Sequence, residues 1–153
     1  MFPSSLITVA RIGVGVEVSS KKRLLESVAA QLAADQPDLV ASVVFERLLE
    51  RERLGSTGLG QGVALPHART RLVTAPLGAF VQVRGAVPFD AIDDQPVDLA
   101  FGLLVPEAAT DEALQLLAHL AGMFSDQDLR SALREATTAE RLQALLVDWS
   151  PRR

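Results

Sequence analysis

The chain has 153 residues, of which 48% are hydrophobic and 22% charged, a composition typical of one folded domain and unlike a disordered segment. Its net charge of −4 argues against nucleic acid as the main partner, and the absence of Cys excludes disulfides, thiolate metal sites and cysteine nucleophiles. Apolar runs such as 99–105 are too short to span a bilayer, so we expect no membrane insertion. The N-terminal segment lacks the early basic residues of a secretory signal, so we expect a cytoplasmic protein.

Two amphipathic helices are predicted in the first third of the chain. Ser19 or Ser20 can cap a helix that runs to about Asp35. Its apolar positions at helical spacing are Leu24, Leu25, Val28, Ala29 and Leu32. Pro37 and Asp38 open a second helix, which ends at a glycine-rich stretch. Its predicted inward residues are Leu39, Val43, Leu48 and Leu49, and its predicted solvent-facing residues are Glu46, Arg47, Glu50 and Arg51.

Strands are predicted in the middle of the sequence. Residues 63–65 form a short apolar run that Pro66 stops, and 77–84 and 97–105 have the composition of longer strands. The run 97–105 is apolar throughout, which indicates a central strand buried on both faces. Turn-forming residues fill the segment between the two longer strands.

The last third of the chain is predicted to be helical again. Thr110 caps a helix to about Phe124, and Ser125 or Asp126 caps a short one. The last helix is capped by Thr137 or Thr138 and ends near Trp149. Helices before and after a group of strands predict an α/β fold, a mixed β-sheet flanked by helices on both faces.

The segment 53–71, RLGSTGLGQGVALPHARTR, combines four glycines, a Ser-Thr pair and a histidine that follows a proline. A nucleotide-binding P-loop would need Lys and Ser or Thr where this chain has Gln61 and Gly62, and the dinucleotide-binding spacing fails at Val63. We therefore expect neither ATP nor NAD. Taken alone, the glycines could equally mark turns with positive φ.

His67 is the residue in this segment that is best suited to catalytic chemistry. A metal site would need further ligands, and His119 is the only other histidine. A Ser-His-Asp triad would need a nucleophile elbow, which the sequence GSTG does not supply. Neutral imidazole can instead take a phosphoryl group and later release it. Such transfer needs positioning and positive charge around three oxygens, which backbone N–H groups, hydroxyls and the five arginines between 47 and 71 can supply.

Four acidic residues between the longer strands could suggest a divalent metal site. They are Asp90, Asp93, Asp94 and Asp98. Their spacing does not match a calcium-binding loop, and Asp and Pro both favour turns. We therefore expect a structural connection there, with neither a metal nor any cofactor.

The segment 51–67, RERLGSTGLGQGVALPH, resembles the signature of phosphotransferase-system enzyme IIA domains of the fructose/mannitol type, and most resembles the nitrogen-regulatory IIA proteins. The likeness continues through 87–106 (VPFDAIDDQPVDLAFGLLVP) and 19–33 (SSKKRLLESVAAQLA), so it spans roughly the whole chain. It implies a single type 2 EIIA domain over residues 1–153, with the sandwich fold of mannitol-type enzyme IIA.

The resemblance also implies a site. In it, His67 accepts a phosphoryl group from an HPr-like phosphocarrier (NPr in the nitrogen-related system), and Arg51 lies against the phosphohistidine and stabilises the phosphate. The implied phosphate loop is formed by Gly55, Ser56, Thr57 and Gly58. Arg69 and Arg71 match no fixed family role, and we expect both to be solvated charges.

One position departs from the family pattern. Members usually carry a second active-site histidine in an H-L-x-x-L-A stretch, where this chain has Ala113 in A-L-Q-L-L-A. His119 does not replace it, because six residues on a helix turn through about 600° and place it on another face, at the surface or the edge of a groove. We expect the missing histidine to alter the rate of transfer or onward donation.

Three functions follow from these observations. The first is a phosphorylatable regulatory protein whose state governs docking to targets such as transporters or sensor kinases, through an apolar rim with Leu59, Leu65 and Ala68. The second is an enzyme IIA component that passes phosphate to a fructose/mannitol-type sugar transporter. The third is an interaction module without transfer chemistry, which the intact His67 and Arg51 argue against. Whether the protein counts as an enzyme, in the phosphotransferase class, stays open.

Overall fold

The computed structural model describes residues 2–151, so the outermost residues of the predicted 1–153 domain lie outside the described part. Within that part, six strands form one sheet with the order β1-β5-β6-β3-β2, and β4 pairs with β6. The strands are β1 (Ile12–Val16), β2 (Gly58–Gly60), β3 (Val63–Ala64), β4 (His67–Thr70), β5 (Leu77–Val87) and β6 (Val97–Pro106). β5 and β6 are antiparallel, whereas β1 is parallel to β5 and both β3 and β4 are parallel to β6.

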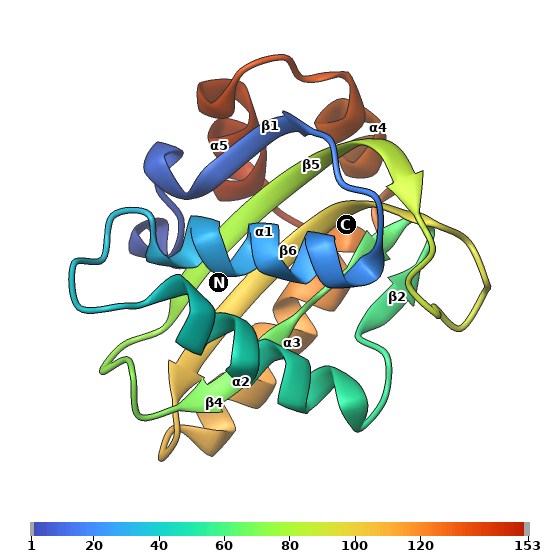
Figure 1. Cartoon of the computed structure of the whole chain (residues 1–153). Helices are drawn as coiled ribbons and strands as arrows, with labels where there is room; N and C mark the ends of the chain where they lie inside the picture. The colour runs from blue at the N-terminus through green and yellow to red at the C-terminus, as the bar shows by residue number, and fades with distance from the viewer. Residues whose placement is uncertain (1, 152–153) are drawn as a thin grey trace.

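Helices cover both faces of this sheet (Figure 1). The helices α1 (Lys21–Ala33) and α2 (Ala41–Arg53) lie on one face. The other face carries α3 (Thr110–Phe124), α4 (Gln127–Glu135) and α5 (Ala139–Asp148). Two short 3-10 turns, η1 (Ser4–Leu6) and η2 (Val9–Arg11), precede β1. The predicted mixed sheet with helices on both faces is therefore confirmed. No helix within residues 2–151 combines the length and the apolar character needed to cross a membrane.

Three of the predicted helix starts are confirmed by capping hydrogen bonds. The side chains of Ser20, Asp126 and Thr138 each accept from backbone N–H groups in the first turn of α1, α4 and α5. Thr110 is the first residue of α3 and makes no side-chain cap. Its predicted capping role is wrong, and its hydroxyl has another partner described below.

The second helix begins later than predicted. Pro37 and Asp38 precede it in a turn, and α2 starts at Ala41 because 36–39 close a hydrogen-bonded turn of their own, from Leu39 N–H to Gln36 O. The shift changes which residues face inward: Val44 is buried and Val43 is exposed.

The strand β6 separates two hydrophobic cores. Side chains alternate along it, so that Phe101 and Leu103 pack toward α3–α5 while Ala100 and Leu104 pack toward α1 and α2. Gly102 lies between them under α1, where an added Cβ would collide with the Val28 side chain. The predicted central position of this strand is confirmed.

Three of the strands, β1, β2 and β4, were not predicted from the sequence. β2 and β3 form an antiparallel hairpin whose turn is Gln61-Gly62, with φ of 58° and 79°, so part of the glycine-rich segment serves a turn. β1 contains two glycines in five residues, and β4 has the sequence HART, neither of which shows a strand pattern. β4 follows β3 after only Leu65 and Pro66, so the two lie one after the other along the same side of β6.

Candidate functional site

His67 is the first residue of β4 and lines a groove of about 770 Å³, the His67 groove. The groove lies where the sheet meets one helix from each layer. α2 contributes Arg47 and Arg51, its C-cap residue is Leu54, and α3 contributes Thr110, Ala113, Leu114 and Leu117. Because β4 pairs only with β6 among the described strands, its other edge is open and side chains of α2 reach past it into the groove.

The imidazole of His67 is held in one orientation. Its Nδ1 lies 2.7 Å from the carbonyl oxygen of Leu65. A carbonyl can only accept a hydrogen bond, so Nδ1 carries the proton in the neutral ring and Nε2 keeps its lone pair. The ring is half-buried, which leaves part of it open to a reactant. The structure therefore presents Nε2 as the nucleophilic atom.

The surroundings of His67 keep the ring neutral. Burial lowers the pKa of His67 below the ordinary imidazole value of 6.5, and the positive charge of Arg51 lowers it further. The hydrogen bond to Leu65 and the carboxylate of Glu52 act in the opposite direction but do not reverse the shift. At neutral pH the ring is thus in its uncharged, nucleophilic form.

An NMR titration of the imidazole resonances is expected to place the pKa of His67 below 6.5. The unfolded chain then takes up this proton at a higher pH than the folded chain, so the contribution of His67 to stability is fully present above pH 6.5 and is lost as the pH falls from 6.5 through the lowered pKa of the folded state. Arg51→Gln removes one cause of the shift and should raise the pKa. A titration midpoint for His67 at or above 6.5 would contradict this account.

Arg51 brings an unneutralised positive charge to the His67 groove. Its Nη1 donates to the carbonyl oxygen of Gly55 at 2.8 Å, which fixes the side chain at the end of α2. Among residues 2–151 no carboxylate lies within ion-pair distance of Arg51, whereas Arg47 pairs with Glu50 at 2.6 Å. The structure thus brings together the predicted pair of His67 and Arg51.

The predicted phosphate loop is placed beside the groove, and its polar groups are engaged elsewhere. Ser56 Oγ donates to the carbonyl of Phe89 at 2.9 Å and accepts from Gly58 N–H at 3.1 Å. Thr57 is buried and donates both its N–H and its hydroxyl to Glu52. Within the described chain, none of Gly55, Ser56, Thr57 and Gly58 lines the His67 groove. Their contact with a phosphate therefore stays a prediction.

A buried ion pair under this loop was missed by sequence reasoning. The Glu52 side chain is 4% exposed and its Oε1 lies 2.8 Å from Lys21 Nζ at the start of α1. Lys21 also donates to the Phe89 carbonyl at 3.2 Å. Glu52 sits among charged residues at the end of α2, which suggests a solvated position. Its spacing of four from Leu48 and eight from Val44 was the signal for a buried position.

Ala113 lines the His67 groove, at the position where the family resemblance implies a second histidine. His119 faces elsewhere, as its helical spacing predicts. It is half-buried, with its ring centroid 5.6 Å from that of Trp149, and its Nε2 has no hydrogen-bond partner among the described residues. His119 is therefore only partly exposed, because Trp149 packs against its ring.

The apolar rim of the groove matches the predicted one only at Ala68, which lines the groove although it is largely buried. Leu65 is buried in the core, and neither Leu65 nor Leu59 lines the groove. The exposed apolar residues at the groove are instead Leu54 and Leu114, which are 85% and 62% exposed. They come from α2 and α3 and lie on the two helical walls.

The acidic segment after β5 makes structural contacts. Asp93 accepts from the N–H groups of Gln61 and Gln95, and these bonds hold its pKa below the ordinary value. Asp98 pairs with Arg134 at 2.9 Å. Within residues 2–151 no group of three or more His, Cys, Asp or Glu side chains is arranged to hold a metal ion. These contacts agree with the predicted structural connection.

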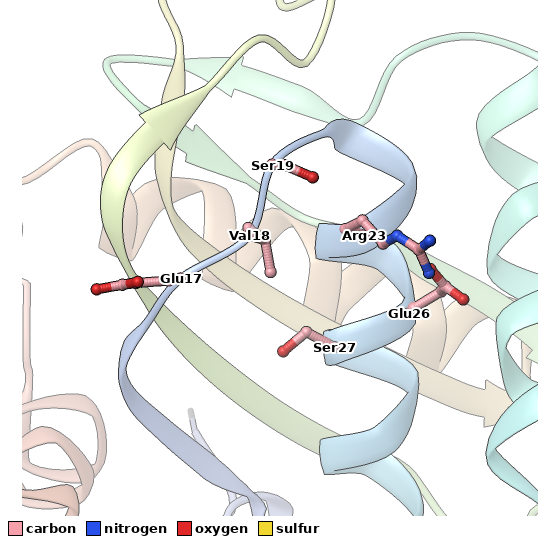
Figure 2. Close-up of a pocket in the computed structure, with 6 residues that line it drawn as sticks. All are labelled: Glu17, Val18, Ser19, Arg23, Glu26 and Ser27. Carbon is pink, nitrogen blue, oxygen red and sulfur yellow. The ribbon is translucent and has the colours of Figure 1, made fainter.

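A second hollow, of about 660 Å³, lies between residues 17–19 and α1 (Figure 2). Arg23 and Glu26 lie side by side there and are paired at 2.9 Å, so the arginine is already neutralised. The residues drawn in Figure 2 include no histidine. The His67 groove is therefore the better candidate for covalent chemistry.

Comparisons with known proteins relate nearly the whole chain to one family. Residues 5–149 match the family described as "Phosphoenolpyruvate-dependent sugar phosphotransferase system, EIIA 2". The chain is 47% identical over 143 residues to a nitrogen regulatory protein of Pseudomonas aeruginosa, covering 94% of this chain and 93% of that protein. Its fold is similar to nitrogen regulatory protein IIA-Ntr of Neisseria meningitidis, with a TM-score of 0.87, 46% identity and coverage of 94% and 97%. For IIA mannitol of Escherichia coli the TM-score is 0.76, at 22% identity and coverage of 92% and 98%, a likeness of fold.

Proposed function

Because this chain belongs to the EIIA type 2 family of the phosphoenolpyruvate-dependent phosphotransferase system, we propose that it is a regulatory protein that carries a phosphoryl group on His67. An HPr-like phosphocarrier, the NPr of a nitrogen-related system, is the donor. The observation that carries the proposal is the arrangement of His67, whose Nδ1 is hydrogen-bonded to Leu65 while Nε2 is left for a reactant. Arg51 lines the same groove and has no carboxylate partner among residues 2–151.

The proposed transfer needs no proton from His67. The lone pair on Nε2 attacks the phosphorus of the carrier's phosphohistidine, a bond from Nε2 to phosphorus forms, and the bond to the carrier's nitrogen breaks with its electron pair returning to the carrier's ring. The His67 ring then carries positive charge, which the Leu65 carbonyl stabilises through Nδ1–H. Arg51 binds the phosphoryl oxygens.

The regulatory part of the proposal rests on what a phosphate would do to the groove. It would add nearly two negative charges between the exposed Leu54 and Leu114, the apolar residues that a target protein would cover. Charge repulsion and the cost of desolvating the phosphate would then make the affinity for a target differ between the phosphorylated and the unphosphorylated protein. The likeness to nitrogen regulatory proteins over nearly the whole chain favours regulation of targets such as transporters or sensor kinases. We place the protein in the cytoplasm and treat 1–153 as one domain.

Onward transfer to a sugar transporter is the second candidate, since the family description names sugar phosphotransferase systems. It differs from the first in the fate of the phosphoryl group: a transport component passes it on to a IIB domain, whereas a regulator keeps it. Ala113, in place of the usual second histidine, favours the regulator because α3 then supplies no imidazole for the departing phosphoryl group.

Phosphorylation can be tested on the purified full chain. Incubation with phosphoenolpyruvate, enzyme I and an HPr-like carrier is expected to add one phosphoryl group by intact-mass measurement, and the adduct should be lost in acid and kept in base. Adding a IIB domain then separates the two candidates, because rapid loss of the adduct would indicate sugar transport. The Ala113→His variant should change the transfer rate. An unphosphorylated wild-type chain would leave the interaction module as the remaining function.

A further inference from the structure

We propose that Arg69 is a second phosphate-binding residue of the His67 groove, and that it serves where the family pattern has a histidine at position 113. This inference rests on the proposed function, since it concerns the same phosphoryl group. It departs from the expectation that Arg69 is a solvated charge like Arg71. Three properties of Arg69 carry it: its place on β4, its charge and its contact with α3.

The first property is its position in the strand. Successive side chains of β4 point to opposite faces, so His67 and Arg69 share one face. Ala68 between them points into the core under α1 and α2. Pairing with β6 sets His67 opposite Leu103 and Arg69 opposite Val105, and all four residues line the His67 groove. Arg69 thus lies two residues along the same wall from the phosphoryl acceptor.

The second property is its unneutralised charge. Of the three arginines in the groove, Arg47 is paired with Glu50, while neither Arg51 nor Arg69 has a carboxylate partner among residues 2–151. Glu107 also lines the groove, but it accepts from Arg71 at 2.7 Å. Two guanidinium groups without counter-ions therefore face the same groove, one from α2 and one from β4. An anion of high charge density is the ligand that such a pair favours.

The third property is its orientation. Arg69 Nη1 donates to Thr110 Oγ1 at 2.9 Å, at the first residue of α3. Thr110 precedes Ala113 by three residues and so lies on the same face of the helix. The bond uses one of the five N–H donors of the guanidinium and leaves the others for phosphoryl oxygens. Ala113 and Arg69 both line the His67 groove, and the methyl group of Ala113 is smaller than the imidazole that the family pattern has at this position.

Burial and the charge of Arg51 lower the pKa of His67. The proposed partner of Arg69 is instead the phosphoryl group bound to Nε2, so Arg69 is a phosphate-binding residue and not one that activates the imidazole.

Arg69→Gln tests the inference, with Arg71→Gln as the matched control. Both arginines are exposed and near the end of β4, so neither change should disturb folding, which circular dichroism can verify. Arg69→Gln is expected to slow phosphorylation of His67 by the carrier about tenfold, the effect of one lost charge-assisted hydrogen bond. Arg71→Gln should stay within about twofold of the wild type, as expected for a surface ion pair. Arg69→Lys should retain part of the rate, because it keeps the charge but not the fork.

A second readout separates phosphate binding from a structural role. In ³¹P NMR of the phosphorylated protein, each guanidinium that contacts the phosphoryl group stabilises its dianion. Arg69→Gln and Arg51→Gln are both expected to raise the pKa of the phosphoryl group, and Arg71→Gln to leave it unchanged. Adding Ala113→His to Arg69→Gln should recover part of the lost rate, since a histidine then reaches the same oxygens.

Equal behaviour of Arg69→Gln and Arg71→Gln in both readouts would overturn the role of Arg69 while leaving His67 phosphorylation intact. A wild-type chain that takes no phosphoryl group would overturn both the proposed function and this inference. The two failures are therefore distinguishable in one set of samples.

Discussion

Replacing His67 with Gln is expected to abolish the acid-labile phosphoryl adduct completely, while His119→Gln leaves it at the wild-type level. Gln has a similar size and can still donate to the Leu65 carbonyl, so the local structure should survive, but its amide nitrogen has no lone pair for attack on phosphorus. His119 lies against Trp149 on another face of α3 and does not line the His67 groove. Intact-mass measurement after incubation with the carrier system compares the two variants.

The two histidine variants control for each other, because the chain contains two histidines in all. If the adduct persisted in His67→Gln and disappeared in His119→Gln, the phosphoryl acceptor would be His119. His119 does not line the His67 groove, so the proposed site would be refuted. An adduct that persists in both variants and withstands acid would indicate a hydroxyl acceptor, and would refute the phosphohistidine.

Glu52→Ala is expected to lower the free energy of unfolding by about 3–5 kcal/mol, the typical effect of removing one partner of a buried ion pair. The change leaves Lys21 without its closest carboxylate and removes the acceptor of both the N–H and the hydroxyl of Thr57. Lys21 is 23% exposed and retains the Phe89 carbonyl, so the loss should lie toward the lower end of that range. Urea denaturation followed by circular dichroism measures it.

Glu50→Ala provides the matched control for this prediction. Glu50 lies two residues earlier on α2 and pairs with Arg47, but both side chains are exposed, and such a pair contributes about 0–1 kcal/mol. Glu52→Gln should fall between the two, because the amide keeps the shape and an acceptor but not the charge. If Glu52→Ala unfolds no more readily than Glu50→Ala, the pair beneath the loop does not support the fold.

The helical layers could be predicted from sequence because their signals are local. Capping residues such as Ser20 and Asp126 lie within three residues of the N–H groups that they satisfy, and the buried stripe of α1 follows helical spacing. Pro37 suggested an early start for the second helix, but residues 36–39 formed a separate turn. Local preference was right about helix formation there and wrong about where the helix begins.

The strands β1 and β4 could not be predicted because their partners are distant in the sequence, whereas β2 is a Gly-Leu-Gly segment that pairs with the neighbouring β3 and carries no strand pattern. Residues 67–70 form a strand since β6 offers them a parallel edge more than thirty residues away, and nothing in HART itself favours it. Buried Arg11 is a similar case: its guanidinium bonds to Asp35 and to the Gly78 carbonyl, neither of which its neighbours in sequence reveal.

The candidate site was predicted in its main residues and not in its supporting ones. His67 was identified from the chemistry of its segment and Arg51 from the resemblance, and both line one groove. The engagement of Ser56 and Thr57 with Phe89 and Glu52 depends on contacts across the fold, which a glycine-rich motif cannot reveal. The absence of a carboxylate partner for Arg69 among residues 2–151 likewise depends on which acidic side chains the fold brings close to each arginine.

The walls of the His67 groove belong to different layers of the protein, since α2 packs on one core and α3 on the other, with β6 between them. A protein docked on both walls would clamp the two layers together. Its binding energy would then oppose unfolding of the entire molecule, and amide hydrogens on both sides of the sheet would exchange more slowly in the complex. Occupancy of this surface could thus be followed from sites far from the interface.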